Sequence, residues 1–390
     1  MIDKKYQIIA DFDIHDMMSE YLDVCRIDFQ RLDLKNQQPL IDVIRYKASN
    51  TKPILCIIKW KTLERLLAER SPHNDFKQMC LQNRIKVLIN SSEDPFFNFQ
   101  YGLKAVKHDL EYDLPDHLGR IFDGFGSKHF KDIQQLKLDI LINGSAGHYL
   151  TDRFANWRFV EIGHWFERFF WSSHIYHLKE DHAPEHTFFS LIRFQENCRE
   201  HRQSFYDAIK DRPLFDQAFI RTTGGHDDPP IHQDPYDYFP SKWLDSLGTR
   251  SCQVPMLEYY KKSCFEVVCE TYGDIPNDDS FYVTEKICKP ILMKHPFVVV
   301  GNKNYLENLR SIGFKTFDGL IDESYDSMND HKQRAEAISN LLSDLDLEKS
   351  KKFYRDSRDI CEHNQKVLLS KIGRYKFDLW NNLKLYFDSI

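Results

Sequence analysis

The chain has 390 residues, which exceeds the size at which single hydrophobic cores usually stop growing, so two domains are expected. Hydrophobic residues make up 42% of the chain and 29 residues are phenylalanine, which supplies ample core and excludes an intrinsically disordered protein. The formal net charge of -6 argues against a surface coated for nonspecific nucleic-acid binding, although a local basic groove is compatible with it.

The nine cysteines are odd in number, scattered along the chain, and include no CxxC pair. This distribution argues against zinc ribbons and redox motifs, and we predict no metal site. Most of the cysteines fall within apolar patterns, so we expect them to be reduced and buried. The N-terminal apolar stretch is too short for a signal peptide, and no apolar run reaches the ~18 residues of a membrane span.

Residues 1–178 predict an N-terminal α/β domain on the acceptor side of a ligand site. Short apolar strands alternate there with helical patterns, which implies a mainly parallel sheet. Ligands of such sheets bind beyond the carboxyl ends of the strands, so the residues just after each strand are the most informative. The predicted strands are Tyr6–Ala10, Pro53–Trp60, Ile85–Asn90 and Leu138–Asn143.

Asp11-Phe12-Asp13 follows the first predicted strand and is open to three interpretations. It matches the metal-binding DxD of glycosyltransferases of the GT-A type, the nucleophile strand of a dehalogenase-like phosphatase, or a solvated turn whose aspartates cap a helix. The phosphatase pattern requires Thr or Ser two residues after the second aspartate, where this chain has His15.

Residues 185–345 predict a second, Rossmann-like domain. It begins with a strand at Thr187–Arg193, after which Asn197 can cap a helix. Arg202 lies near the start of that helix, and a guanidinium group suits a diphosphate because it can donate two parallel hydrogen bonds. Arg193 or Arg199 could take this role instead, and a surface arginine without a ligand is the plain alternative.

The stretch Phe281–Asp326 contains the clearest pattern in the chain. Thr284 can cap a helix, and the unbroken apolar run after Pro296 predicts a strand buried on both faces of a parallel sheet. A strand at Ser263–Thr271 is predicted just before this stretch. The predicted elements within it are, in order, a helix beginning at Glu285, a strand at Phe297–Val300, a helix at Tyr305–Ile312 and a strand at Phe314–Phe317.

Glu285 and Lys286 place a carboxylate and an ammonium group at the start of the first of these helices. The N-terminus of a helix favours anionic ligands. Lys286 can meet a diphosphate there, while Glu285 can accept hydrogen bonds from two vicinal ribose hydroxyls. The adjacent pair could therefore bind a nucleoside diphosphate.

The order Tyr282-Val283-Thr284-Glu285-Lys286, an apolar strand ending in Gly301, and a following helix resembles the donor-binding region of the family 10 fucosyltransferases and related GT-B enzymes. The segments 313–317 and 321–326 look like those of phage, algal-virus and bacterial glycosyltransferases. The resemblance covers roughly residues 185 to 345. It implies an α/β, GT-B-like fold with two facing Rossmann-like domains and C-terminal helices, residues 346–390, that cross back to the N-terminal domain.

The resemblance also implies roles for individual residues. The family's contacts to the nucleotide sugar would fall on Tyr282, Glu285 and Lys286, with Thr284 inside the same motif. The turn that contains Arg202 resembles the turn that such enzymes place beside the donor phosphates.

Two further implied roles are less direct. The family has an asparagine six residues before the motif tyrosine, where this chain has Pro276, so Asn277 is the nearest substitute. A first-domain glutamate near a strand end serves the family as general base, and Glu93 or Asp94 is the best-placed analogue. The alternative for these two residues is a pair of exposed acids in a turn.

The function that the resemblance implies is metal-independent and inverting transfer of a sugar from a nucleotide sugar, GDP- or UDP-linked, to a hydroxyl of a glycan or other small acceptor. Two alternatives stay open: a phage-type DNA glycosyltransferase acting on 5-hydroxymethylcytosine, and a catalytically inactive binding protein of the same fold. The family's Golgi members carry an N-terminal membrane anchor, and we expect none in this chain. We therefore expect a soluble bacterial or viral type in the cytoplasm, or in the host cytoplasm if the protein is viral.

Overall fold

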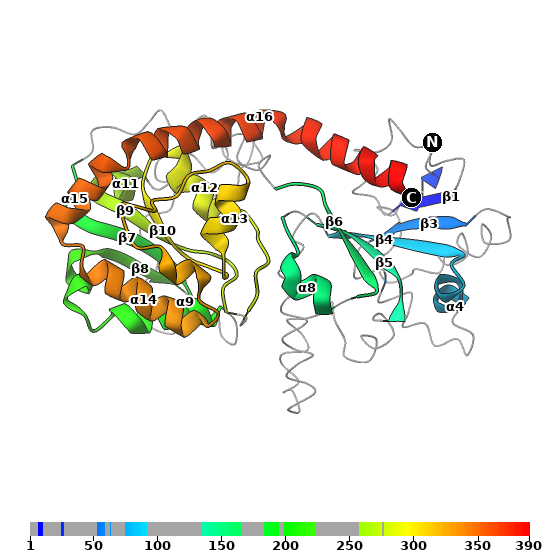
Figure 1. Cartoon of the computed structure of the whole chain (residues 1–390), viewed down its shortest axis with the longest axis horizontal. Helices are drawn as coiled ribbons and strands as arrows, with labels where there is room; N and C mark the ends of the chain where they lie inside the picture. The colour runs from blue at the N-terminus through cyan, green and yellow to red at the C-terminus, as the bar shows by residue number, and fades with distance from the viewer. Residues whose placement is uncertain are drawn as a thin grey trace, which may run out of the picture. The chain divides into compact units, whose positions relative to one another are not determined.

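The protein is an α/β protein with two separate parallel sheets and C-terminal helices, seen in a computed structural model (Figure 1). The chain splits into two compact units, of which unit 1 comprises Met1–Ala146, Leu150–Gly163 and Leu379–Ile390, and unit 2 comprises Gly147–Tyr149 and His164–Asp378. The predicted domain boundaries at residues 178, 185 and 345 stay predictions. The structure describes residues 7–10, 25–26, 53–58, 63, 75–91, 135–142, 144–153, 155–164, 183–194, 199–223, 257–274 and 277–390.

Unit 1 contains a six-stranded sheet in the order β2-β1-β3-β4-β5-β6, with every neighbouring pair parallel. The four strands that the apolar runs predict are confirmed. The sequence did not predict the two edge strands, which are β2, of only two residues, and β6, which is half-exposed and so lacks a continuous apolar run. The strands are β1 (Gln7–Ala10), β2 (Cys25–Arg26), β3 (Ile54–Ile58), β4 (Ile85–Ser91), β5 (Leu138–Ile142) and β6 (Trp157–Glu161).

Unit 2 contains a four-stranded parallel sheet in the order β10-β9-β7-β8. Every residue of β9 and β10 is buried, as expected for strands covered on both faces. The three predicted strands at these positions are confirmed, and β8 was not predicted. The strands are β7 (His186–Arg193), β8 (Phe219–Thr223), β9 (Ser263–Cys269) and β10 (Phe297–Val300).

Helices cover both faces of this second sheet (Figure 1). Because side chains alternate along a strand, the Phe265 ring meets Phe353 of α15, while Glu266 accepts a hydrogen bond from Tyr260 of α11. The helices of unit 2 before the C-terminal region are α9 (Glu200–Ile209), η5 (Pro213–Gln217), α11 (Leu257–Lys262), α12 (Glu285–Leu292), α13 (Tyr305–Ser311), η8 (Ser324–Ser327) and α14 (His331–Ser343). Helices α4 (Asp75–Leu81), α8 (Gly147–Arg153), α15 (Leu347–Asp356) and α16 (Arg358–Ser389) complete the described set.

The C-terminal end of α16 belongs to unit 1. Tyr386 donates a hydrogen bond of 2.6 Å to the buried carboxylate of Asp139 on β5, which is also paired with Lys86 at 3.1 Å. The guanidinium of Arg158 lies 5.1 Å from the centre of the Tyr386 ring and donates to Ser389. The last turns of the helix are therefore fixed by a buried charge and an aromatic contact.

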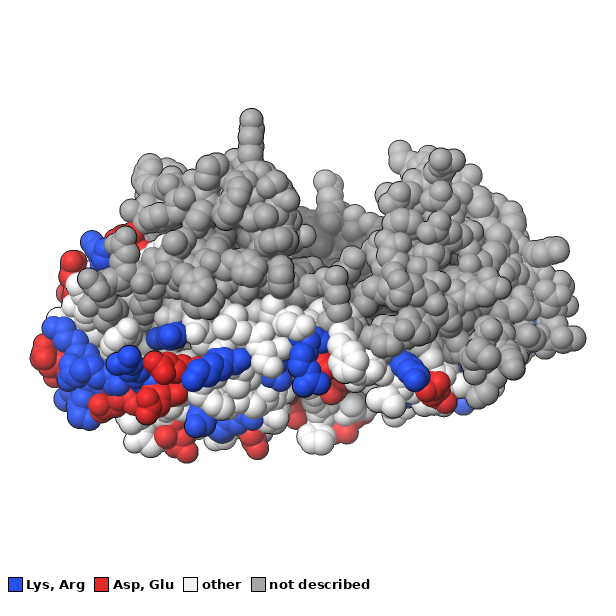
Figure 2. Space-filling view, turned by 90° about the horizontal axis from the view of Figure 1, so that it is seen from above, with Lys and Arg blue, Asp and Glu red and all other residues white. Residues whose placement is uncertain are grey.

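Charges of both signs are mixed over the described part of the face in Figure 2. Within α15 and α16 they form ion pairs one helical turn apart, such as Lys351 with Glu348 and Arg374 with Asp378. Among the described helices, none combines the length and apolar character that crossing a membrane requires. Five of the six described cysteines are buried and all six are free thiols, as the sequence predicted.

The predicted strand at Phe314–Phe317 is wrong, because this segment has no strand pairing. Both phenylalanines are buried, but side chains rather than a neighbouring strand satisfy the backbone. The Asn364 amide accepts from the N–H of Lys315 at 2.7 Å and donates to its carbonyl at 2.8 Å, and Glu323 accepts from the N–H of Phe317. An apolar, alternating segment thus obtains its hydrogen bonds from Asn364 of α16 and from Glu323, the residue before η8.

We predict that Asn364→Ala lowers the free energy of unfolding by about 2 kcal/mol. The N–H and the carbonyl of Lys315 would both lose their partner, the amide of Asn364, which is 1% exposed. Chemical denaturation measures this change. The control Asn382→Ala, half-buried on the same helix, should cost less than about 0.5 kcal/mol. Equal effects of the two substitutions would contradict the assignment of Asn364.

Candidate functional site

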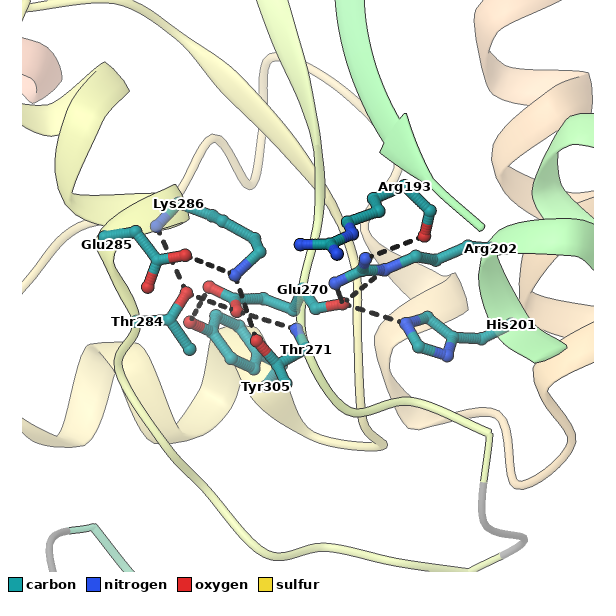
Figure 3. A network of polar contacts seen from close by, with 9 residues as sticks. All are labelled: Arg193, His201, Arg202, Glu270, Thr271, Thr284, Glu285, Lys286 and Tyr305. Carbon is teal, nitrogen blue, oxygen red and sulfur yellow. Dashed lines mark hydrogen bonds and ion pairs between the residues drawn. The ribbon is translucent and has the colours of Figure 1, made fainter. Parts of the chain in front are cut away.

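The candidate site lies at the carboxyl edge of the four-stranded sheet, where β9 ends and α12 begins. Glu270 and Thr271 directly follow β9, and the N-terminal residues of α12 meet them there (Figure 3). Open parallel sheets bind ligands beyond the carboxyl ends of their strands, so this edge is the expected place for a ligand.

Thr284 caps helix α12, as the sequence predicted. Its backbone is extended, and its hydroxyl oxygen accepts a hydrogen bond of 3.1 Å from the N–H of Lys286. The hydroxyl proton points the other way and is donated to Glu270 Oε2 at 2.6 Å. Thr284 therefore satisfies a helix N–H and a buried carboxylate at once, and a cap of this kind stabilises a helix by about 1 kcal/mol.

Glu285 and Lys286 pair with each other at the surface of the site. Lys286 Nζ donates to Glu285 Oε1 at 2.6 Å and to Thr271 Oγ1 at 3.0 Å. The two side chains are 28% and 24% exposed, so both reach solvent. Burial acts to raise the pKa of Glu285, but the charge of Lys286, its hydrogen bond and the charge of Lys289 lower it to about 2. Glu285 is therefore ionised at neutral pH.

Glu270 is a buried carboxylate that connects three elements. It accepts hydrogen bonds from Thr284 Oγ1 at 2.6 Å, from Tyr305 OH at 2.9 Å and from the N–H of Thr271 at 3.1 Å. Its residue is 2% exposed, and burial raises its pKa, against the charge of Lys286 and the hydrogen bond from Thr284. Three donors around one carboxylate favour its charged form.

Arg202 is buried, at 1% exposed, and bonds to the main chain. Its Nε and Nη2 donate to the carbonyl of Glu270 at 3.0 and 2.6 Å, and its Nη1 donates to the carbonyl of Arg193 at 3.0 Å. These bonds tie the carboxyl ends of β7 and β9 together. In the protein alone, the guanidinium group of Arg202 donates to these two carbonyls. Contact between Arg202 and a ligand phosphate stays a prediction.

His201 adds a second side chain at the Glu270 carbonyl. Its Nε2 lies 3.0 Å from that oxygen, and the ring is 1% exposed. Burial lowers its pKa to about 3, against the opposing charge of Asp274 and with a further lowering by the nearby Arg202. The ring is therefore neutral at ordinary pH and serves as a hydrogen-bonding group.

The segment before the motif is fixed against the end of β10. Asn302 Nδ2 donates to Asp278 Oδ2 at 3.2 Å and to the carbonyl of Ser280 at 2.9 Å. Asn277 is exposed, with a φ of 60°, and its N–H donates to the carbonyl of Asn329 at 3.3 Å. Tyr282 is half-buried, and its ring lies edge-on to Tyr272 with centroids 6.2 Å apart.

The structure brings Thr284, Glu285 and Lys286 together at one helix start, with Arg202 connected to them through Glu270. The proposed bases Glu93 and Asp94 lie outside the described residues, as do Asp11, Asp13 and Asn197. Among the described residues, no group of three or more His, Cys, Asp or Glu side chains is arranged to hold a metal ion.

Sequence reasoning missed Glu270, Thr271 and Tyr305. The sequence did contain a signal, because an acid and a hydroxyl directly follow the apolar run Phe265–Cys269 and so fall at the carboxyl end of a strand. Extending the predicted strand to Thr271 placed both inside the sheet instead. Tyr305 carried no such signal, since a tyrosine at the start of a helix is common.

No protein-family model matches the chain, and no curated protein matches it. What the site can do must therefore be argued from its own groups. A carboxylate and an ammonium group at a capped helix N-terminus could bind a ligand that carries both hydroxyls and an anionic group.

Glu266, a buried glutamate on β9, yields a test of how burial acts on this strand. Tyr260 OH donates to Glu266 at 2.5 Å, and burial raises the pKa of Glu266 from 4.5 to about 7, against the charge of Lys289 and the hydrogen bond from Tyr260. Below about pH 4.5 the carboxyl is protonated in both the folded and the unfolded chain. Between about 4.5 and 7 only the unfolded chain loses the proton, so the free energy of unfolding falls as the pH rises.

We predict that Glu266→Gln flattens this dependence, because the amide cannot ionise and can still accept from Tyr260. The loss of stability between about pH 5 and pH 8, measured by urea denaturation, should shrink by up to about 3 kcal/mol. The exposed Glu307→Gln on α13 is the control and should keep the wild-type dependence. An unchanged pH dependence in Glu266→Gln would show that the buried acid does not titrate as described.

Proposed function

We propose that the chain is a glycosyltransferase of GT-B-like fold that binds a nucleotide sugar, GDP- or UDP-linked, at the start of α12. The observation that supports this most is the pair Glu285 and Lys286, which reaches solvent at a capped helix N-terminus on the carboxyl edge of a parallel sheet. Its residue types match the two parts of such a ligand, since a carboxylate accepts from ribose hydroxyls and an ammonium group neutralises a diphosphate.

Ligand binding would replace a contact that the protein makes with itself. In the protein alone, Glu285 and Lys286 satisfy each other at 2.6 Å. A nucleotide sugar would supply hydroxyl donors to Glu285 and phosphate oxygens to Lys286, so that each partner of the ion pair exchanges one bond for another. The pair thus keeps both charges solvated and oriented until the ligand arrives.

The proposed reaction is attack of an acceptor hydroxyl on the anomeric carbon, with cleavage of the bond between that carbon and the diphosphate oxygen. The acceptor proton passes to a general base, for which Glu93 and Asp94 are the candidates. Charge that develops on the leaving diphosphate is stabilised by Lys286 and by the N-terminus of α12. The acceptor is a hydroxyl of a glycan or other small molecule.

Substitutions of the pair test this proposal by calorimetric titration with GDP-, UDP- and CMP-sugars. Lys286→Ala should weaken binding of the preferred nucleotide sugar at least about tenfold, because a charged hydrogen bond to phosphate is lost. Glu285→Ala should weaken the nucleotide sugar similarly but bind inorganic diphosphate at least as well as wild type, because Lys286 is then unpaired from its carboxylate. Weaker binding of the nucleotide sugar together with undiminished binding of diphosphate would indicate loss of a ribose contact, and not a loss of folded structure at the site.

Lys352→Ala on α15 is the matched control, since Lys352 also forms an ion pair with a neighbouring acid, Asp356, on a helix surface. It should bind every ligand as wild type does. The proposal is refuted if no nucleotide sugar binds wild type, or if both Glu285→Ala and Lys286→Ala bind as wild type does. Transfer of labelled sugar to glycans, compared with hydroxymethylcytosine DNA, then distinguishes the acceptor classes.

A further inference from the structure

The backbone and the ammonium group of Lys286 each bond to a residue that also bonds to the Glu270 carboxylate (Figure 3). The main-chain N–H of Lys286 donates to Thr284 Oγ1 at 3.1 Å, and its Nζ donates to Thr271 Oγ1 at 3.0 Å. Thr284 Oγ1 in turn donates to Glu270 Oε2 at 2.6 Å, and the N–H of Thr271 donates to the same oxygen at 3.1 Å. One carboxylate oxygen therefore reaches both the backbone and the ammonium group of Lys286, through two separate residues.

The chemistry of a carboxylate is needed for this arrangement. Thr284 accepts from the N–H of Lys286 and donates its one hydroxyl proton to Glu270 Oε2. The N–H of Thr271, which can only donate, points at the same oxygen. Tyr305 OH donates to the other oxygen, Oε1, at 2.9 Å. An ionised glutamate only accepts, whereas a glutamine would place an N–H against one of these donors. At 2% exposed, Glu270 has little access to water that could replace a lost partner.

We propose that Glu270 is a positioning residue: its ionised carboxylate fixes the direction of Lys286 at the candidate site without touching the ligand. The hydrogen bonds act through Thr271 and Thr284. The negative charge of Glu270 also attracts the ammonium group of Lys286. The effect on Lys286 is a property of the chain itself. Only its consequence, tighter binding of a nucleotide sugar, rests on the proposed function.

The test measures the reactivity of Lys286 without any ligand. Competitive acylation of the lysine amines with trace acetic anhydride, followed by mass spectrometry of the full chain, gives a rate for Lys286 relative to the exposed Lys332 in the same sample. In Glu270→Gln we expect Lys286 to react on the order of threefold to tenfold faster, the factor that corresponds to one lost hydrogen bond. The increase follows because a Lys286 side chain that is held less firmly toward Thr271 and Glu285 presents its amine to the reagent in more orientations.

Glu266→Gln is the matched control, because Glu266, on β9, is likewise a buried glutamate that accepts from a tyrosine hydroxyl. It should leave the Lys286 rate unchanged. Thr271→Val removes one of the two acceptors of Lys286 Nζ, keeps Glu285, and should raise the rate. Tyr305→Phe removes only the bond to Oε1 and should not. These two variants decide the question if Glu270→Gln does not fold, and the melting temperature of each variant is recorded beside its rate.

The proposal is overturned if Lys286 reacts at the wild-type rate in Glu270→Gln and Thr271→Val, or if Glu266→Gln and Tyr305→Phe raise the rate equally. Its failure is distinguishable from failure of the proposed function. A chain that shows the predicted rates but binds no nucleotide sugar refutes the function and keeps the role of Glu270. A chain that binds a nucleotide sugar through Lys286, but whose variants all show the wild-type acylation rate, refutes the role of Glu270 and keeps the proposed function.

Discussion

The buried carboxylate of Glu270 is the interaction on which the candidate site depends. A charge that is 2% exposed is costly unless donors surround it, and here helices α12 and α13 and the residue after it provide them. Its carbonyl oxygen accepts from Arg202 and lies within hydrogen-bonding distance of His201 on α9. One residue at the end of one strand thus fixes the relative positions of three helix starts.

This arrangement divides the site into buried polar groups and charged groups that reach solvent. Glu270, Thr284 and Tyr305 are buried and bonded to one another, whereas the side chains of Glu285 and Lys286 reach solvent, at 28% and 24% exposed. The low pKa of Glu285 keeps it charged across the physiological range, because Lys286 offsets the effect of burial. A preorganised, charged pair of this kind is what binding of a diol next to a diphosphate requires.

The sequence predicted those elements that a single capping residue or a single apolar run indicates. The apolar runs of β3, β4, β5, β9 and β10 and the cap at Thr284 follow from local patterns, and the structure confirms them. The prediction failed where a side chain distant in the sequence supplies the backbone hydrogen bonds. At Phe314–Phe317, Asn364 from α16 takes the place of a strand partner. Edge strands β6 and β8 were missed because half-exposed strands lack an apolar run. Glu270 was missed because the predicted strand extended past it to Thr271, and its side-chain partners lie 14 and 35 residues away in the chain.

The measurement that tests the central claim most directly is a crystal structure of the chain with the nucleotide sugar that binds best. The account predicts that the diphosphate lies within hydrogen-bonding distance of Lys286 Nζ and that the ribose hydroxyls donate to the Glu285 carboxylate, with the bond between the two side chains broken. Thr284 and Glu270 should keep their hydrogen bond and touch no ligand atom. A nucleotide bound elsewhere, with the Glu285–Lys286 pair intact, would contradict the account.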